Sequence, residues 1–335
     1  MRGTIEINLT KLKSNYLKVK EYANKEVIAV IKSNAYGHGI LPVAKALVDS
    51  NCTSFLVATL EEALLLRTSN INARIIVLEN TKNYFVIYRN NLSLSISSME
   101  ELKDVFSFNH PLKLQLKIDT GLNRLGLLPN EIDEVILLLS KSKHIIEGIY
   151  THIQDETTYE EQEKIFYKSI NKFDLSKIKM ININSSSYLH HHLSYTTHVR
   201  CGLCLYGYSS LIDVEPILSL YVPIYRKIRV NKGDYIGYHK HASTPENGYL
   251  YTVPLGYADG WNKNYITFAY ANEIMQQVGD TCMDHMMFFS TKNYNGNNLE
   301  IIGPNLPLSI LNKYNFSSPY EVISSLSPRI IRKYI

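Results

Sequence analysis

Apolar and polar positions alternate over the first two thirds of the chain in a pattern that predicts buried strands. Each of eight short runs is rich in β-branched or apolar residues and is bounded by polar or turn-forming residues, as expected of a strand buried on both faces. The predicted strands are Val27–Lys32, Phe55–Thr59, Arg74–Leu78, Leu92–Ser97, Leu112–Asp119, Ile145–His152, Met180–Asn184 and Val199–Tyr206.

The segments between these runs carry apolar residues at helical spacing, so predicted strands and helices alternate. The predicted helices are Lys11–Ala23, Pro42–Val48, Leu60–Arg67, Met99–Phe106, Glu131–Leu139 and Tyr159–Phe173. Eight strands that alternate with helices favour the α/β class and a (β/α)8 TIM-like barrel over an open sheet. One feature departs from that pattern, because the first predicted helix precedes the first predicted strand.

Beyond Tyr208 the pattern changes to short apolar runs separated by Gly, Asn and Pro, which predicts a β-rich second domain. Its predicted strands are Ile224–Val230, Tyr249–Pro254, Met286–Phe289 and Leu299–Ile302, and Tyr320–Leu326 is predicted as a helix. We therefore expect a barrel over residues 10–219 and a C-terminal β domain over residues 220–335. Residues 1–9 are expected to pack on the C-terminal domain.

Length and composition agree with two globular domains. The chain has 335 residues, which exceeds the range of about 250 to 300 residues that one hydrophobic core usually serves. The net charge of +4 is spread along the chain without a basic block, so we expect no nucleic-acid partner. No apolar run is long enough to cross a membrane, and the first residues lack the apolar core of a signal peptide, so we expect a cytoplasmic protein.

The cysteines do not form a paired framework, which suits a reducing compartment. Cys201 and Cys204 are three residues apart, but no second Cys or His pair accompanies them, so no metal site is predicted. The four cysteines are Cys52, Cys201, Cys204 and Cys282.

Lys32 is the first candidate for chemistry, because it ends an apolar run and opens the polar turn Ser33-Asn34-Ala35-Tyr36-Gly37. Burial lowers the pKa of a lysine, and the neutral amine can attack a carbonyl to form a Schiff base. Pyridoxal 5'-phosphate chemistry requires such an amine. The alternative is a lysine whose ammonium group simply reaches solvent from the end of a strand.

The predicted seventh and eighth strands carry candidate phosphate ligands, since the loops after these strands usually hold phosphate in a barrel. Asn184 and Ser185 follow the seventh strand, and Gly202 and Leu203 lie in the eighth. Hydroxyl and backbone N–H groups suit a cofactor phosphate, and Tyr36 is a further candidate donor. Alternatively, the serines only cap the following helix.

Arg200 is a candidate for the group that faces the pyridine nitrogen of this cofactor. An arginine is always cationic and keeps that nitrogen unprotonated, which favours simple reprotonation of the substrate Cα. Racemisation also needs a proton donor on the face opposite Lys32, and Tyr257 is a candidate, with His152 linking it to Arg200. Taken alone, Tyr257 is one of 25 tyrosines, and packing roles for it and for His152 remain alternatives.

These motifs resemble those of the bacterial alanine racemase family, which consists of fold-type III pyridoxal enzymes. The resemblance runs from the first predicted helix to Arg332. The segments that carry it are Lys32 to Gly39, Lys117-Ile118-Asp119-Thr120-Gly121 with Arg124, Thr151-His152, Asn184-Ser185, Arg200 with Gly202, Gly256-Tyr257-Ala258-Asp259-Gly260, and Cys282-Met283-Asp284.

The resemblance implies a role for each candidate residue. Lys32 is the cofactor lysine and the base for the D-side proton, while Tyr257 from the other subunit of a head-to-tail homodimer is the base for the L-side proton. Arg200 binds the pyridine nitrogen, with His152 beside it. The phosphate is held by Tyr36, Ser185, Gly202 and Leu203, and Asn184 also binds the cofactor. The substrate carboxylate is bound by Arg124 and by the backbone of Met283 from the other subunit, with Cys282 and Asp284 nearby and a carbamylated Lys117 that orients Arg124.

The chain also departs from the family pattern at several positions. The stretch between Tyr257 and Cys282 has 24 residues, fewer than is usual. Cys201 replaces the usual proline after Arg200, and Pro328 replaces a tyrosine near the phosphate. The resemblance implies alanine as substrate and D-alanine for peptidoglycan as product. A racemase for serine or another amino acid, a decarboxylase of the same fold and a silent pyridoxal-binding protein are the alternatives.

Overall fold

The computed structural model describes residues 2–315 and 317–335 and divides into two units. The barrel unit comprises Leu12–Ala35 and Ile40–Glu215, and the β unit comprises Met1–Lys11, Tyr36–Gly39 and Pro216–Ile335. The short segment Tyr36–Gly39 therefore belongs to the β unit although both neighbouring segments of chain belong to the barrel unit.

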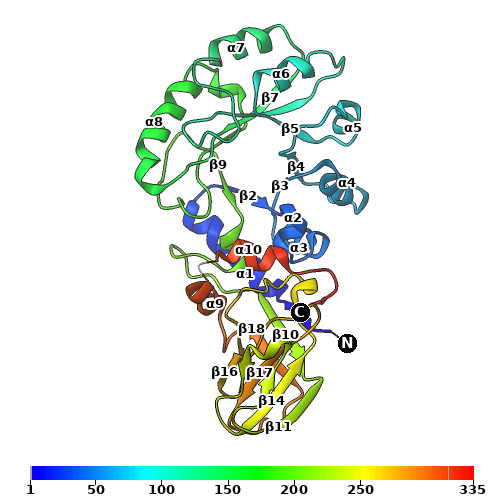
Figure 1. Cartoon of the computed structure of the whole chain (residues 1–335). Helices are drawn as coiled ribbons and strands as arrows, with labels where there is room; N and C mark the ends of the chain where they lie inside the picture. The colour runs from blue at the N-terminus through cyan, green and yellow to red at the C-terminus, as the bar shows by residue number, and fades with distance from the viewer. Residues whose placement is uncertain (1, 316) are drawn as a thin grey trace. The chain divides into compact units, whose positions relative to one another are not determined.

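Eight parallel strands form the barrel, in the order β8-β7-β6-β5-β4-β3-β2-β9 (Figure 1). Hydrogen bonds from Thr197 N–H to the Ile181 carbonyl and from Arg200 N–H to the Asn184 carbonyl link β9 to β8 and nearly close the sheet. The predicted TIM-like barrel is thereby confirmed. The strands are β2 (Glu26–Val30), β3 (Ser54–Val57), β4 (Arg74–Val77), β5 (Ser93–Ile96), β6 (Lys113–Lys117), β7 (Ile145–Tyr150), β8 (Met180–Asn182) and β9 (His198–Cys201).

Helices follow most of these strands and bury one apolar stripe each. In α8 the buried residues include Tyr159, Gln162, Phe166 and Ile170, which recur every three or four positions as an amphipathic helix requires. None of the described helices has the length and apolar character needed to cross a membrane. The helices up to α8 are α1 (Leu9–Ala23), α2 (Lys32–Tyr36), α3 (Ile40–Val48), α4 (Leu60–Thr68), α5 (Tyr84–Arg89), α6 (Met99–Val105), α7 (Ile132–Ser140) and α8 (Tyr159–Ile170), with 3-10 turns η1 (Glu156–Thr158) and η2 (Leu175–Lys177).

A polar network lies near the amino ends of the barrel strands. The Arg74 Nε–H donates to Glu147 Oε1 at 2.9 Å, and the Ser93 hydroxyl donates to the same carboxylate. The Gln115 amide donates to Glu147 at 3.2 Å. Because the buried carboxylate is fully paired, this network stabilises the base of the barrel without leaving a lone charge.

The eighth predicted strand, Val199–Tyr206, is wrong in its second half. Strand β9 ends at Cys201, and Leu203–Tyr206 forms the 3-10 helix η3. Gly202 breaks the strand with ψ of −80°, and Gly207 ends η3 in the left-handed region with φ of 94°. A short apolar run can be buried either as a strand or as a 3-10 helix, so the periodicity of apolar residues alone does not distinguish the two.

A nine-stranded sheet dominates the β unit, in the order β11-β14-β17-β16-β15-β18-β10-β1-β19. Neighbouring strands in this sheet pair antiparallel, except β1 and β19, which pair parallel. The predicted β-rich domain is confirmed. The strands are β1 (Thr4–Ile7), β10 (Leu218–Pro223), β11 (Arg226–Val230), β14 (Gly248–Val253), β15 (Phe268–Tyr270), β16 (Ile274–Gln277), β17 (Met286–Ser290), β18 (Asn298–Ile302) and β19 (Ile331–Tyr334), with a separate pair β12 (Tyr235–Ile236) and β13 (Ala242–Ser243).

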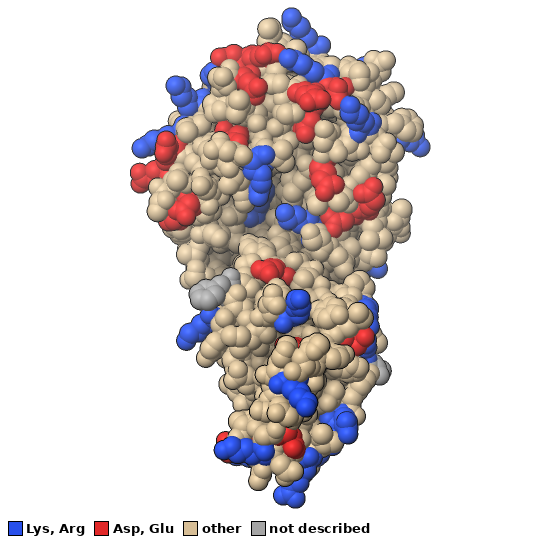
Figure 2. Space-filling model, viewed as in Figure 1, with Lys and Arg blue, Asp and Glu red and all other residues tan. Residues whose placement is uncertain are grey.

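Helices α9 (Leu308–Asn315) and α10 (Pro319–Ser325) complete the β unit. Helix α10 begins with Pro319 after the Ser318 side chain, which accepts a hydrogen bond from Glu321 N–H. This N-cap followed by proline is a common helix start. On the face drawn in Figure 2, acidic and basic side chains are interspersed over the barrel unit instead of forming a patch of one sign.

Candidate active site

Lys32 lies two residues after the end of β2, at the start of α2, which is a left-handed turn. Ser33, Asn34 and Ala35 have φ values of 53° to 55° and ψ values of 46° to 51°, and Tyr36 has φ of 52°. Non-glycine residues pay an energetic penalty in this region, and such strained backbone is concentrated at functional sites. The Glu62 carboxylate supports the turn by accepting from Asn34 N–H at 2.9 Å and Ala58 N–H at 2.9 Å.

The Lys32 amine is half-buried and donates no hydrogen bond to any residue within the described chain. Burial lowers its pKa, and the nearby Arg124 guanidinium lowers it further, while Glu62 acts in the opposite direction. A lysine with a lowered pKa supplies more neutral amine near neutral pH. Lys32 is therefore suited to nucleophilic attack or proton transfer.

Lys117 ends β6 and is a second buried lysine in the barrel unit. Burial, followed by the charges of Arg124 and Arg200, lowers its pKa to about 8. Arg124 lies seven residues later in the exposed loop after β6. Three cationic side chains therefore act on one another here.

Arg200 is a buried arginine in β9, held on several sides by the barrel. Its Nη1 group donates to the Asn182 backbone carbonyl at 3.4 Å and to the Asn182 side chain, and its Nη2 group donates to the Thr151 carbonyl at 2.5 Å. The guanidinium carbon also lies 4.9 Å from the centroid of the Tyr150 ring. Among the described residues, none accepts from the Arg200 Nε–H, so this donor is left for a ligand.

His152, just beyond β7, lies next to Arg200, with 3.5 Å between Arg200 Nη2 and His152 Nδ1. Burial lowers its pKa to about 3, with further contributions from Arg200 and Arg124. The ring is therefore neutral near neutral pH. Because Arg200 can only donate, Nδ1 is the acceptor and the ring proton resides on Nε2.

The candidate phosphate ligands lie where β8 and β9 end. The Asn184 side chain accepts from Tyr159 Oη at 2.5 Å and donates to the His191 carbonyl at 2.6 Å. The backbones of Ser185 and Arg200 form an isolated parallel β-bridge. These bonds orient both residues at the carboxyl end of the barrel.

The Gly202 N–H donates to the Ser186 hydroxyl at 3.1 Å. Leu203 opens η3, so its N–H belongs to the first turn, where intrahelical acceptors are absent. The Gly202 and Leu203 amides therefore lie at the start of a helix, where an anion is favoured. Helix η3 is short, so other donors must contribute to binding.

Tyr36 is the one candidate phosphate ligand that belongs to the β unit. It is 9% exposed, and its ring lies 5.4 Å from that of Tyr320 in α10. The following Gly37 has φ of +81°, and a Cβ there would lie 2.3 Å from the Ile323 carbonyl oxygen. Only glycine fits this close approach, which fixes the backbone immediately after Tyr36.

In the β unit, two loops bring the Tyr257 and Met283 backbones together. Tyr257 N–H donates to the Cys282 carbonyl at 3.2 Å, and Ala258 N–H donates to the Met283 carbonyl at 3.0 Å. The side chains of Tyr257 and Met283 are 45% and 54% exposed. Within the described chain the Tyr257 hydroxyl has no hydrogen-bond partner, so it is available to a ligand or a second molecule.

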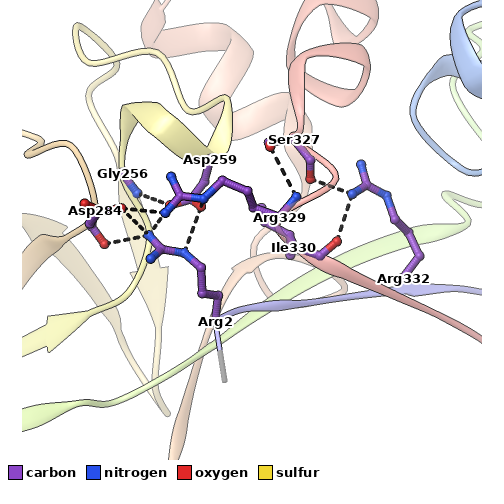
Figure 3. Close-up of polar contacts among 8 residues, drawn as sticks. All are labelled: Arg2, Gly256, Asp259, Asp284, Ser327, Arg329, Ile330 and Arg332. Atoms are coloured by element: carbon purple, nitrogen blue, oxygen red, sulfur yellow. Dashed lines mark hydrogen bonds and ion pairs between the residues drawn. The ribbon is translucent and has the colours of Figure 1, made fainter.

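Asp259 links the backbone at Gly256 to Arg2 (Figure 3). Its buried carboxylate accepts from Arg2 at 2.9 and 2.6 Å and from Gly256 N–H at 3.0 Å. Asp284 accepts from Arg329 at 2.7 Å. Asp284 therefore forms ion pairs within the β unit, and its carboxylate positions the loop that carries Met283.

Sequence analysis missed the residues that orient Arg200, namely Tyr150 and Asn182. Both are the last residues of their strands, β7 and β8, and both are buried. A polar residue at the carboxyl end of a barrel strand was the available signal. It was overlooked because each lies inside an apolar run.

Comparisons with known proteins agree with this arrangement. The family model described as alanine racemase, N-terminal domain, matches residues 7–210, and that described as alanine racemase, C-terminal domain, matches residues 217–334. The alanine racemase of Clostridium tetani is 30% identical over 98% of this chain and 94% of its own length. That of Fusobacterium nucleatum is 32% identical over 86% of each chain.

Solved structures are similar over the whole chain. The alanine racemase of Clostridium difficile 630 has a TM-score of 0.91 at 26% identity and covers 100% of this chain and 96% of its own. A structure of alanine racemase from Bacillus anthracis with bound L-Ala-P has a TM-score of 0.92 at 26% identity, covering 100% of this chain and 95% of its own.

Proposed function

This chain belongs to the alanine racemase family, and from that premise we propose how its residues divide the work of interconverting L-alanine and D-alanine. The reaction depends on pyridoxal 5'-phosphate and supplies D-alanine for peptidoglycan. When bound, the cofactor supplies an electron sink that makes the Cα proton of the substrate acidic. A cytoplasmic location remains a prediction from the sequence.

The side chains of the barrel unit fit an anionic cofactor and substrate. Besides burial, the charge of Arg124 lowers the pKa values of Lys32 and Lys117. The pKa of His152 is lowered by burial and by the charges of all four cationic side chains, Lys32, Lys117, Arg124 and Arg200. The carboxylates of Glu62 and Glu101 act in the opposite direction but are engaged by backbone N–H groups. A cluster of cations with few free counter-charges suits a phosphate and a carboxylate.

Lys32 and Tyr257 are the two bases in this proposal. The unpartnered, partly buried Lys32 amine holds the cofactor and moves the proton on the D side of Cα. The exposed Tyr257 hydroxyl of the second subunit of a head-to-tail homodimer moves the proton on the L side. A phenol ordinarily has a pKa near 10, so positive neighbours are required for it to act as a base.

Arg200 and His152 support the reaction from within the barrel. Burial lowers the pKa of Arg200 to about 10, which still leaves it protonated at neutral pH. Its free Nε–H is the donor that we assign to the pyridine nitrogen. The neutral His152 carries its proton on Nε2, so it can donate to the Tyr257 oxygen and link it to Arg200.

Arg124 binds the substrate carboxylate, and Lys117 orients it. An ammonium group on Lys117 would repel Arg124, and burial has brought the pKa of Lys117 to about 8. A substantial neutral fraction can therefore react with carbon dioxide, and the resulting carbamate anion would attract Arg124. We propose that Lys117 is carbamylated for this reason.

The remaining candidates are the Met283 loop of the β unit and the residues proposed for the phosphate. Met283 N–H is proposed to bind the substrate carboxylate, with Cys282 before it and Asp284 after it. The hydrogen bonds between residues 257–258 and 282–283 support this pairing of roles, since they couple the proton-transfer tyrosine to the carboxylate-binding loop. Tyr36, Asn184, Ser185, Gly202 and Leu203 are proposed to hold the cofactor phosphate.

The observation that carries the proposal is the unpaired Lys32 amine beside the cationic cluster that includes Arg200. The test is to mix purified protein with pyridoxal 5'-phosphate and L-alanine in deuterated water, then measure D-alanine and deuterium at Cα. We expect both products, with slower turnover of L-serine and L-lysine. A protein that binds the cofactor and leaves the Cα proton of alanine unexchanged would refute racemisation.

Subunit mixing tests the proposed dimer. We expect Lys32→Ala and Tyr257→Phe proteins each to have little or no activity alone, but a site formed between subunits regains one intact Lys32–Tyr257 pair in each mixed dimer. After denaturation and joint refolding we expect about a quarter of wild-type activity, because random pairing yields about half mixed dimers with one active site each. No recovered activity, with mixed dimers demonstrated by mass, would place both bases in one subunit.

A further inference from the structure

Three metal-ligating side chains converge in the barrel unit outside the proposed roles. Glu156 lies in η1, and His190 and His191 lie in the loop between β8 and β9. The ligand atoms of all three lie within 4.8 Å of one another. Glu156 Oε1 is 3.2 Å from His190 Nε2 and 2.7 Å from His191 Nε2.

These distances are close to the spacing of ligands around a small divalent ion. Zinc binds His nitrogen and carboxylate oxygen at about 2.0 to 2.2 Å, which places neighbouring tetrahedral ligands about 3.3 Å apart. Both separations, 3.2 and 2.7 Å, are shorter than that value, so the side chains would move slightly apart to admit an ion. Two imidazoles and one carboxylate also form a donor set that zinc and neighbouring transition metals prefer, whereas magnesium and calcium prefer oxygen ligands alone.

The cluster is held in place before any metal binds. The His191 ring stacks on Tyr159, with centroids 3.6 Å apart and planes 11° apart. His191 N–H donates to the Tyr188 carbonyl at 3.2 Å, and its own carbonyl accepts from Asn184. The side chains remain 26% to 55% exposed, which leaves an open path for an ion.

We propose that Glu156, His190 and His191 form a binding site for a divalent transition metal such as zinc, with water in the remaining coordination position. The site is surface-exposed and uses residues 34 and 35 positions apart in the sequence. Because Glu156 is so far from the two histidines in the sequence, the spacing of residues gives no sign of this site, and a metal site was considered only for the cysteines.

Metal binding would also tie the loop that carries Asn184 to η1. Asn184 donates to the His191 carbonyl, and Tyr159 both stacks on His191 and donates to Asn184. A bound ion would therefore restrict the movement of Asn184 and slow release of the cofactor phosphate. This consequence rests on the proposed function, whereas metal binding itself does not.

Zinc titration of tag-free, chelator-treated protein loaded with pyridoxal 5'-phosphate tests the site by calorimetry. We expect one zinc ion per chain, and binding weakened roughly 100-fold or more in His191→Asn and in Glu156→Gln. His192→Asn is the matched control, because His192 is an adjacent exposed histidine whose ring lies against Tyr22. Magnesium should not compete. A visible spectrum of the cobalt-substituted protein reports ligation by nitrogen and oxygen.

Equal zinc binding by the wild type and the His190→Asn/His191→Asn double variant would overturn the site, as would equal losses in His192→Asn and His191→Asn. Thermal melts show that each variant is folded. Cofactor release, followed by absorbance with and without zinc, tests the second step separately. If zinc binds as expected and the release rate does not change, the link to Asn184 fails while the metal site stands.

Discussion

A Cβ atom added to Gly256 would lie 2.3 Å from the carbonyl oxygen of Met283, so the backbones before Tyr257 and at Met283 are in direct contact. Gly256 has φ of −152°, which any residue can adopt. Glycine is therefore needed at position 256 because a side chain would clash with Met283, and not because the backbone is left-handed. This close approach holds a proposed base and a proposed carboxylate ligand in fixed register.

Gly256→Ala should separate these two loops. We expect a loss of about 1 to 3 kcal/mol of stability from overpacking, and a fall in kcat/KM larger than the loss of folded protein explains. Thermal melts and kinetics of the same sample measure the two effects. Gly233→Ala is the comparison for backbone strain without overpacking, since Gly233 has φ of +87° and no atom lies within 4 Å of a Cβ there; it should lower stability without an additional loss of kcat/KM. A fully active Gly256→Ala protein would show that the register is unimportant.

Tyr257→Phe removes the proposed proton carrier on one side only. We expect the cofactor to remain bound and racemisation to fall by about 10²- to 10⁴-fold. In deuterated water the variant should still exchange the Cα proton of D-alanine through Lys32, while L-alanine stays unlabelled. Proton NMR of each enantiomer measures this asymmetry. Equal labelling of both enantiomers would contradict the assignment of Tyr257.

Lys32→Met should abolish the visible absorbance of the covalently bound cofactor and all racemisation, because no other group supplies the amine. Lys117→Met is the control, since Lys117 is also buried and has a lowered pKa but is not assigned to the cofactor. We expect that variant to keep the absorbance and lose activity. If Lys117→Met loses the absorbance and Lys32→Met keeps it, the two roles are exchanged.

Asp259→Asn should destabilise the β unit more than Asp284→Asn, although both carboxylates pair with Arg2. Asp259 is fully buried and Asp284 is 37% exposed. We expect a cost of about 2 kcal/mol or more for the buried carboxylate and a smaller cost for the exposed one, whose ion pairs are screened by solvent. Urea unfolding of the two variants measures the difference. A larger loss in Asp284→Asn would be inconsistent with this order.

His198 should make the protein less stable in acid. Burial lowers its pKa to about 4, and the charge of Arg74 contributes. Between pH 6.5 and 4 the unfolded chain binds more protons at this residue, so stability falls as the pH falls, by about 2 kcal/mol at pH 4.5. In His198→Gln the decrease between pH 7 and 4.5 should be smaller by that amount. An equal decrease in the wild type and in His198→Gln would contradict this role of His198.

Much of the barrel could be predicted because its strands are short, apolar and close in sequence to their partners. Strands β2 to β8 each overlap a predicted run. Helix α5 was missed because Tyr84–Arg89 is only six residues long and carries too few turns to show a periodicity. The end of β9 was missed because η3 is as apolar as a strand.

Long-range pairing in the β unit left no local signal. Strand β1 pairs with β10 and β19, which are separated from it by almost the whole barrel unit or more. The candidate residues were found because they belong to distinctive motifs, whereas their supports, such as Asn182 and Arg2, were not. Arg2 acts through its ion pair with Asp259, and sequence spacing does not reveal a contact across so much chain.

The pairing of β1 with β19 has a consequence for synthesis on the ribosome. Ile335 N–H donates to the Ile7 carbonyl, and Leu9 N–H donates to the Ile335 carbonyl. Strand β1 is therefore translated long before its partner β19, while the barrel strands that lie between them in the sequence pair with one another. A nascent chain can form its barrel before the sheet of the β unit is complete, because β19 follows every other strand of that sheet.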